Sequence, residues 1–310
     1  MMQRVIQRTK QEAVYSRLSD IPRGSASDQI VDGCLVLEGG AFRGLYTQGF
    51  LDAMMQNDLN MSSVIGVSAG ALGGMNYVSG QIGRSACINL GHRHDGRYVG
   101  AKAALHSRSL LDISFLVEER GILEPFDETR FFQPERTFVA VATNCLTGEP
   151  EYFEKGKCPD IVRAVRASAT MPYISPMVKI GGVPYLDGGC ACKIPYVWAL
   201  ARGYEKIIVI RTRDKDFRKE DRLHGAASTV YRKHPEFARR LARSNIDYNH
   251  QCDEIEWLHS EGRLLRMAPS EPVDVARLEG DMEKLGDLYW LGWNDCTERL
   301  DEMKAYLFGS

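Results

Sequence analysis

The chain of 310 residues has no apolar run near the roughly 20 residues that a membrane-spanning helix needs. Its first 30 residues are polar and lack the apolar stretch of a secretory signal. Neither charge sign dominates, and the formal net charge of −2 gives no reason to expect nucleic acid as a partner. With 44% hydrophobic and 26% charged residues the composition is that of a globular protein, and we expect a cytoplasmic one.

The sequence also lacks the spacings that bind metals or staple a domain with disulfides. Its eight cysteines are scattered, as expected for free thiols in a reducing compartment. Cys190 and Cys192, in "CAC", are one residue short of the Cys-x-x-Cys of redox and zinc sites. An Asp/Asn-rich loop of the kind that binds Ca²⁺ is missing as well.

What the sequence does have is an alternation of buried strands and helices. "CLVLEGG" shows no polar alternation, as expected for a strand covered on both faces, and "SSVIGV", "RTFVAVATN" and "EKIIVIRTR" follow the same pattern. Gly-Gly between "PMVKI" and "VPYLD" predicts a hairpin. The fold class is therefore α/β, with three α/β/α layers around a mostly parallel sheet.

The same patterns suggest how the chain is divided. We expect a mobile polar leader over residues 1–30, a core over 31–212, and a mainly helical region over 213–310 packed on the same domain. Residues 81–130 should be mostly helical, with one helix in "LLDISFLVEER". An amphipathic helix, "LEGDMEKLGDLYWLGWNDCTERLDEMKAYL", should close the chain.

A serine stands where a strand gives way to a helix. Gly66-Val67-Ser68-Ala69-Gly70 has the Gly-x-Ser-x-Gly pattern of a nucleophile elbow, a tight turn that presents the hydroxyl at the helix N-terminus. A serine in this place can also be a simple helix N-cap. Of the two interpretations we favour the nucleophile.

The glycine-rich stretch "LEGGAFRG" can supply what such a nucleophile needs. The backbone N–H groups of Gly39, Gly40 and Ala41 lie in a loop that opens a helix and are candidates for an oxyanion hole. A dinucleotide site is disfavoured, since the middle fingerprint position is Ala41 and the next strand ends without an acid for the ribose. A P-loop is disfavoured because no Gly-Lys-Ser/Thr follows.

The base that accepts the serine proton is less obvious. No histidine lies in a recognisable catalytic context among the seven of the chain, which are His92, His94, His106, His224, His234, His250 and His259. Asp187, in "YLDGG", follows an apolar strand, and partial burial would raise its pKa toward that of a useful base. The alternative is a turn aspartate that bonds only its own backbone.

Together these motifs resemble the patatin-like phospholipases and acyl hydrolases over roughly residues 31–212. "GGAFRG" is similar to the family's oxyanion loop, "GVSAG" to its elbow and "DGG" to its aspartate motif. "VATNCLTGEPEYF" and "ASATMPYISPMVKIGGVPYLDGG" add to the likeness. Two positions depart from the family pattern: Ala41, where glycine is commoner, and Glu38, where aspartate often stands.

The resemblance implies a serine acyl hydrolase of phospholipase A or lysophospholipase type that needs no metal or organic cofactor. Ser68 would be the nucleophile and Asp187 the base, while Gly39, Gly40, Ala41 and Arg43 would form or support the oxyanion site. Arg43 could orient that loop, meet a phosphate head group or form a salt bridge. Ala41 should keep its role if its φ is negative, whereas a positive φ would put the loop geometry in question.

Two other functions remain open from the sequence. One is an α/β-hydrolase with a Ser-Asp-His triad, and the other is a catalytically silent protein that binds lipid or a partner. Contact with the inner face of a membrane is a further expectation, since the implied substrate is a phospholipid. The basic helix expected in "YRKHPEFARRLARSNIDY" could lie on anionic lipid or could pack its apolar stripe, Phe237, Leu241 and Tyr248, inward.

Overall fold

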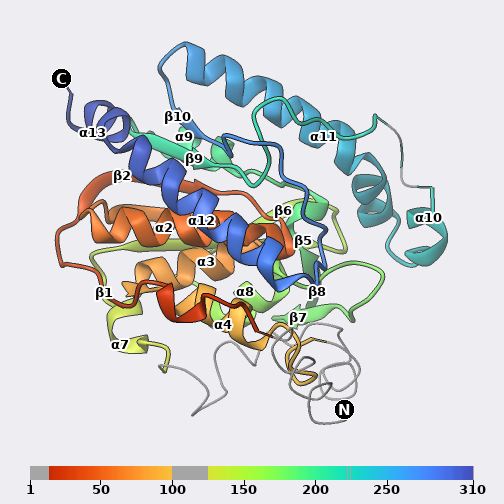
Figure 1. Ribbon diagram of the computed structural model, residues 1–310. Coiled ribbons are helices and arrows are strands. Elements are labelled where there is room, and N and C mark those ends of the chain that lie inside the picture. The colour runs from red at the N-terminus through yellow and green to blue at the C-terminus, as the bar shows by residue number, and fades with distance from the viewer. Residues whose placement is uncertain (1–13, 100–124, 222, 224, 310) are drawn as a thin grey trace, which may run out of the picture.

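A mostly parallel sheet forms the centre of the computed structural model, which describes residues 14–99, 125–221, 223 and 225–309 (Figure 1). The strands run in the order β10-β9-β2-β3-β5-β8-β7, and β6 also pairs with β5. The first five are parallel to one another. They are β2 (Val31–Leu37), β3 (Met61–Val67), β5 (Thr137–Asn144), β9 (Ile207–Ile210) and β10 (Leu265–Met267). The predicted α/β fold is thereby confirmed.

Both faces of this sheet are covered by helices, which explains why its strands read as unbroken apolar runs. Leu35 and Leu37 of β2 point into the core beneath α2 (Gly44–Gln56), α3 (Ala69–Val78) and α12 (Met282–Glu298). Cys34 and Val36 point the other way, toward α9 (Tyr196–Ala201) and α11 (Pro235–Ser260). The result is the three-layer arrangement that the sequence predicts.

Beyond β5 the strands of the sheet are antiparallel to their neighbours. There β6 (Pro150–Glu154) and β8 (Val183–Asp187) pair antiparallel with β5, and β7 (Val178–Ile180) pairs antiparallel with β8. Gly181 and Gly182 join β7 to β8 with φ of 57° and 85°, the double left-handed conformation of a two-residue hairpin. This is the hairpin predicted from the Gly-Gly pair.

The remaining elements are short and surround these layers. They are η1 (Leu18–Asp20), β1 (Gly24–Ser25), η2 (Ala41–Arg43), β4 (Gln81–Ile82), α4 (Arg84–His92), α7 (Glu128–Phe131), α8 (Ile161–Ser168), η3 (Gly188–Cys190), α10 (Ala227–Val230) and α13 (Leu300–Phe308). The helix expected in "LLDISFLVEER" lies outside the described residues. The expected closing helix is in fact two helices, α12 and α13, which meet at Arg299.

The expectation of a mobile leader is wrong for residues 14–30. β1 pairs with β4, and the side chains of Tyr15 and Ile21 belong to the main core. Tyr15 packs against Gly286 of α12, where an added Cβ would lie 2.0 Å from its ring. Buried apolar side chains such as Tyr15 and Ile21 hold this polar stretch against the core. The composition of the stretch does not reveal them, because it averages a few apolar residues with many polar ones.

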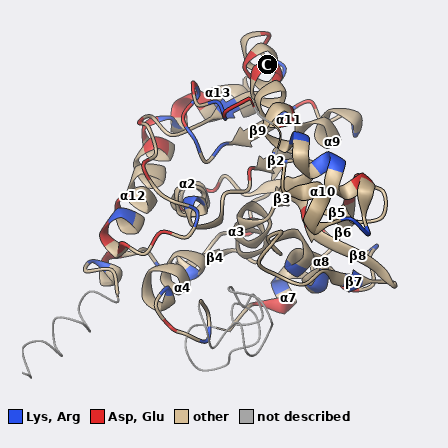
Figure 2. Ribbon diagram, turned by 90° about the vertical axis from the view of Figure 1, so that its right-hand side faces the viewer, with Lys and Arg blue, Asp and Glu red and all other residues tan. Residues whose placement is uncertain are grey.

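Two more expectations concern the surface. In α11 the apolar stripe of Phe237, Leu241 and Tyr248 is buried, so it packs inward and does not offer a face to lipid. No helix in the described part of the chain is both long and apolar enough to cross a bilayer. Lys and Arg are interspersed with Asp and Glu over the outer elements (Figure 2).

The closest contact between two helices joins the C-terminal region to the core. In Figure 1, α12 runs alongside α2. A Cβ on Gly49 of α2 would lie 2.0 Å from the carbonyl oxygen of Tyr289, and a Cβ on Gly292 of α12 would lie 2.0 Å from that of Tyr46. The two backbones therefore touch through a reciprocal pair of glycines, and neither position has room for a side chain.

We expect Gly49→Ala to lower the free energy of unfolding by about 1–3 kcal/mol, because the added methyl group must push two helices apart. The control is Gly73→Ala in α3, where the new Cβ would meet only a Leu51 methyl at 3.6 Å. That change should be neutral or should stabilise by up to about 1 kcal/mol through helix propensity. Urea unfolding of both variants checks this, and equal effects would show that α2 and α12 are not in backbone contact.

Candidate active site

The pairing register of three strands brings Ser68 and Asp187 together. Val67 of β3 pairs with Val141 of β5, and Ala142 pairs with Asp187 of β8. Ser68, one residue beyond Val67, therefore stands level with Asp187 two strands away, a span of about 10 Å between backbones. The side chains close this distance, with Ser68 Oγ donating a 2.8 Å hydrogen bond to Asp187 Oδ2.

The backbone of Ser68 has the strained conformation of a nucleophile elbow. Its φ of 56° and ψ of −121° lie outside the regions that residues other than glycine usually occupy. It stands at the N-cap of α3, but its hydroxyl makes no capping bond, so the interpretation as an N-cap side chain is wrong. Its N–H donates to Ser168 Oγ at 2.8 Å. The turn thus holds the hydroxyl toward Asp187 instead of toward its own helix.

The elbow depends on the glycines that flank the serine. A Cβ on Gly66 would lie 2.5 Å from the carbonyl oxygen of Gly70, and one on Gly70 would lie 2.6 Å from that of Leu37. Strand, turn and helix are therefore packed backbone to backbone, as the Gly-x-Ser-x-Gly spacing predicts.

Each of the two carboxylate oxygens of Asp187 accepts a hydrogen bond. Oδ1 accepts a 2.7 Å hydrogen bond from the N–H of Gly189, and Oδ2 accepts the one from Ser68. The aspartate is therefore a turn residue that bonds its own backbone and also a partner of the serine. Burial raises its pKa above the ordinary 3.8, and the two hydrogen bonds oppose that rise. A higher pKa makes this carboxylate a stronger base.

The glycine-rich loop lies directly against the serine. A Cβ on Gly39 would lie 3.0 Å from the carbonyl oxygen of Val67 and 3.1 Å from the Ser68 Cβ, so a side chain there would crowd the serine. The Gly39 N–H donates to the carbonyl of Lys193 at 3.4 Å, so this donor is already used. Among the described residues, no hydrogen bond engages the N–H groups of Gly40 and Ala41. The set of candidate oxyanion donors is therefore smaller than expected, because it contains the N–H groups of Gly40 and Ala41 but not that of Gly39.

Ala41 adopts the conformation that the sequence left in question, with a φ of 51°. An L-residue other than glycine bears a cost of about 1–2 kcal/mol in this left-handed region. The loop therefore holds an alanine in a left-handed conformation that glycine would adopt without strain.

Arg43 forms no salt bridge with any residue that the structure describes, which speaks against the interpretation as an ion pair. Its side chain is only 8% exposed, its Nε is buried without a hydrogen-bond partner, and no carboxylate pairs with it among the described residues. Burial lowers its pKa to about 10, and the nearby cations Arg213 and Arg277 add to the effect. A buried guanidinium without a partner is costly, which is a reason to expect a ligand for it.

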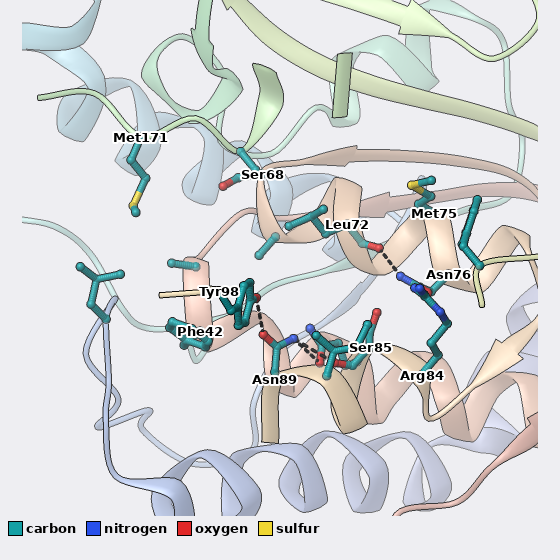
Figure 3. A pocket seen from close by; sticks show the side chains of 17 residues that line it. Phe42, Ser68, Leu72, Met75, Asn76, Arg84, Ser85, Asn89, Tyr98 and Met171 are labelled. Carbon is teal, nitrogen blue, oxygen red and sulfur yellow. Dashed lines mark hydrogen bonds between the residues drawn. The ribbon is translucent and has the colours of Figure 1, made fainter. Parts of the chain in front are cut away.

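An apolar cavity opens beside Ser68 and the loop (Figure 3). Figure 3 shows Ser68, Leu72 and Met171 on one side and Tyr98 and Asn89, which hydrogen-bond each other, on the other. The empty volume is about 740 Å³, part of it open to solvent. The remaining lining residues are mostly apolar, among them Phe42, Ala69, Met75, Ile88, Phe126 and Leu278.

A second cavity meets the first at Ser68. It is larger, with an empty volume of about 1440 Å³ that includes open solvent, and both Ser68 and Asp187 line it. Its wall contains five cationic residues: Arg43, Lys193, Arg213, Lys219 and Arg277. Ser68 therefore stands between an apolar space and a cationic one.

No histidine lines either cavity in the part of the chain that the structure describes. His94 bonds the carbonyl of Gly280 through Nε2, and His259 accepts from the N–H of Arg266. His106 and His224 lie outside the described residues. The described partner of the serine hydroxyl is Asp187 alone.

Sequence reasoning missed the residues that support this pair. Ser168 binds the backbone of Ser68, and Thr143 Oγ1 donates to the carbonyl of Asp187 at 2.8 Å. It also missed Lys193, whose Nζ donates to the carbonyls of Gly189 and Ser244. Ser168 stands in "ASAT", a segment already similar to the family, which was the one available signal.

Comparison with known proteins identifies two regions. The sequence model described as patatin-like phospholipase matches residues 35–198, more than half of the chain. A domain of unknown function (DUF6363) matches residues 234–308.

Individual relatives share less than 30% sequence identity with this chain. The chain is 29% identical to the uncharacterized protein YjjU of Escherichia coli (strain K12) over 183 residues, 57% of this chain and 51% of that protein. It is 24% identical to lysophospholipase nte1 of Aspergillus terreus (strain NIH 2624 / FGSC A1156) over 293 residues, 87% of this chain but 18% of that protein. The chain thus spans about half of the first relative and under a fifth of the second.

Two solved structures are similar at low identity. VipD from Legionella pneumophila aligns with 90% of this chain and 68% of its own, with 15% identity and a TM-score of 0.47. The type III effector protein ExoU aligns with 90% of this chain and 54% of its own, with 12% identity and a TM-score of 0.39.

The strain at Ala41 leads to a testable change in stability. We expect Ala41→Gly to leave the free energy of unfolding unchanged or to raise it by up to about 1 kcal/mol, since glycine adopts a positive φ without strain. Ala305→Gly, on an exposed turn of α13, is the control and should cost about 1 kcal/mol. Urea unfolding measures both, and an equal loss in the two variants would mean that Ala41 is not strained.

Proposed function

The chain belongs to the patatin-like phospholipases, a family of ester-hydrolysing enzymes, and we propose that it cleaves carboxylic esters of lipids with Ser68 and Asp187 as a catalytic dyad. The observation that carries the proposal is the 2.8 Å hydrogen bond between the hydroxyl of a strained elbow serine and a buried carboxylate. Nucleophilic catalysis needs a serine hydroxyl that bonds a base, and here the hydroxyl bonds Asp187 and does not cap its helix.

In the first half of the proposed reaction, Asp187 Oδ2 takes the proton of Ser68 as Oγ attacks the ester carbonyl carbon. The carbonyl oxygen becomes an oxyanion, which the N–H groups of Gly40 and Ala41 are free to bind. When the tetrahedral intermediate collapses, the bond to the alcohol oxygen breaks and the alcohol leaves with the proton held by Asp187. The acyl group remains on Ser68 as an ester.

In the second half, water attacks the acyl carbonyl and gives a proton to Asp187. The same oxyanion donors act again, the bond to Ser68 Oγ breaks, and Oγ recovers the proton as the carboxylic acid leaves. Asp187 thus acts alternately as base and acid. Its Gly189 bond holds one oxygen in place while the other exchanges the proton.

The apolar cavity supports a substrate with a hydrocarbon chain. Its lining of Leu72, Met75, Ile88 and Phe126 offers burial of apolar surface worth about 25 cal/mol per Å². Polar residues also line it, and several bond one another: Arg84 with Asn76, and Asn89 with Gln48 and Tyr98. We therefore propose that the acyl chain lies there with its carbonyl at Ser68. The substrate class is an acyl ester of a lipid, met at a membrane surface.

We expect Ser68→Ala to reduce hydrolysis of p-nitrophenyl butyrate by at least about 10⁴-fold, since removal of a nucleophile has effects of that size. A fluorophosphonate probe should label the wild type and leave Ser68→Ala unlabelled. Ser63→Ala, which removes a serine bonded to Tyr204 instead of Asp187, is the control and should keep full activity and labelling. Equal rates for wild type and Ser68→Ala would remove this serine from the mechanism.

The raised pKa of Asp187 predicts a pH dependence. Only the carboxylate accepts the serine proton, so kcat/KM should fall as pH drops through a pKa above the ordinary 3.8 of aspartate. Because the folded protein binds this proton more tightly than the unfolded chain, ionisation of Asp187 lowers stability as pH rises through the window between 3.8 and the raised pKa.

Asp187→Asn separates these two effects. It should reduce kcat by about 10²–10⁴-fold, the usual contribution of a general base. At neutral pH its free energy of unfolding should equal or exceed that of the wild type, because a buried charge is replaced by a neutral amide of the same shape. Activity that stays constant down to pH 4, or an active Asp187→Asn, would contradict the role of the carboxylate.

A further inference from the structure

The larger cavity beside the dyad carries a strong excess of positive charge. Its five cations face only two carboxylates, Glu38 and Asp187. Both are already engaged: Glu38 accepts from the N–H of Thr212 at 2.7 Å, and Asp187 accepts from Gly189 and Ser68. The two carboxylates offset only part of the positive charge, so five basic side chains face two acidic ones in the described part of the wall.

Several of these cations keep unused hydrogen-bond donors. The buried Nε of Arg43 and that of Arg213 have no partner, and no ion pair or side-chain hydrogen bond of Arg277 occurs among the described residues. Lys193 gives two hydrogen bonds to carbonyl groups, which leaves one of its three donors. These donors line one cavity, from the buried Arg43 through the half-buried Lys193, Arg213 and Lys219 to the exposed Arg277. Donors that line one cavity and lack acceptors have the chemistry of an anion site.

Burial and mutual repulsion lower the pKa of two lysines in this cavity. Burial, with a smaller contribution from Arg277, lowers the pKa of Lys193 to about 8. Burial, together with Lys193 and Arg277, lowers the pKa of Lys219 to about 6. An anion placed among these side chains would relieve both effects, because an opposite charge favours the protonated form.

We propose that this cavity binds the phosphate of a substrate whose head group is a phosphomonoester, and that the enzyme prefers such anionic lipids to zwitterionic ones. The inference rests on the proposed function, since it places the acyl chain in the apolar cavity and the phosphate in the cationic one, with the ester at Ser68 between them. A phosphomonoester carries close to two negative charges at pH 7 and three acceptor oxygens, which suit several cations at once.

A choline head group fits this wall poorly. Its quaternary ammonium would need a carboxylate or an aromatic face, and the two carboxylates of the wall already accept hydrogen bonds and stand among five basic side chains. Two of the three aromatic rings are covered by cations: Arg213 lies 4.5 Å from the ring centre of Phe217, and Lys219 lies 4.3 Å from that of Tyr248. The third, Tyr173, packs against Tyr231. The same cations that attract phosphate therefore repel the positive end of a zwitterion.

Binding of non-hydrolysable amphiphiles tests the proposal without relying on turnover. Dodecyl phosphate, dodecylphosphocholine and inorganic phosphate are titrated into the full chain by calorimetry, each amphiphile below its critical micelle concentration. We expect dodecyl phosphate to bind at least about tenfold more tightly than dodecylphosphocholine, as charge-assisted hydrogen bonds require. Equal affinity for the two amphiphiles would overturn the proposal.

Inorganic phosphate distinguishes a lipid head group from a free anion. We expect it to compete with dodecyl phosphate only at concentrations at least about tenfold higher, because it lacks the chain that fills the apolar cavity. Competition at equal concentrations would show a site for a free phosphate and would overturn the assignment to a head group.

The double variant Lys219→Gln/Arg277→Gln should abolish most of the preference, bringing the two amphiphiles to within about threefold of each other. Arg239→Gln, which removes an exposed cation of α11 that pairs with Glu236, is the matched control and should keep the wild-type ratio. A double variant that folds, as its circular dichroism shows, and retains the full preference would place the phosphate elsewhere.

Hydrolysis separates failure of this inference from failure of the proposed function. If p-nitrophenyl butyrate is cleaved through Ser68 while the two amphiphiles bind equally, the dyad stands and the phosphate site falls. If the ester is not cleaved while dodecyl phosphate binds selectively, the anion site stands without the proposed chemistry.

Discussion

The hydrogen bond between Ser68 and Asp187 depends on strand register, because the two residues are 119 positions apart in the chain and belong to strands that do not touch. β5 lies between them and pairs with β3 on one side and β8 on the other. A shift of one residue in either pairing would turn one side chain to the opposite face of the sheet. The loop and the elbow can then be positioned around the pair because Gly39, Gly66 and Gly70 let backbones meet without side chains between them.

Much of this arrangement could be predicted from the sequence, because local patterns determine it. The unbroken apolar runs predict buried strands, the Gly-Gly pair predicts the β7–β8 hairpin, and Ser68 between Gly66 and Gly70 predicts the elbow. The backbone conformation at Ala41 and the direction of the Gly39 N–H could not be predicted. The N–H of Gly39 bonds the carbonyl of Lys193, and the N–H of Phe42, next to Ala41, bonds that of Arg277, and both acceptors lie far away in sequence.

The cationic cavity could not be predicted for a related reason. Its basic residues come from the glycine-rich loop, from the segments after η3 and β9, and from the stretch before α12, and no sequence pattern marks any of them. The net charge of −2 describes the whole surface and averages over such a local excess. Low-dielectric walls concentrate the field of a few converging charges, so a protein with almost no net charge can still present a strongly positive site.

The C-terminal region does more than cover the sheet. The carbonyl oxygen of Arg277 accepts a hydrogen bond from the N–H of Phe42, and Tyr248 and Arg277 line the same cavity as Ser68 and Asp187. Gly292 lets α12 pack closely on α2, the helix that follows the glycine-rich loop. The stretches matched by the two family models therefore build one site between them. A chain cut between the two stretches would therefore lose the part of the wall that faces Ser68 together with the helix that packs on α2.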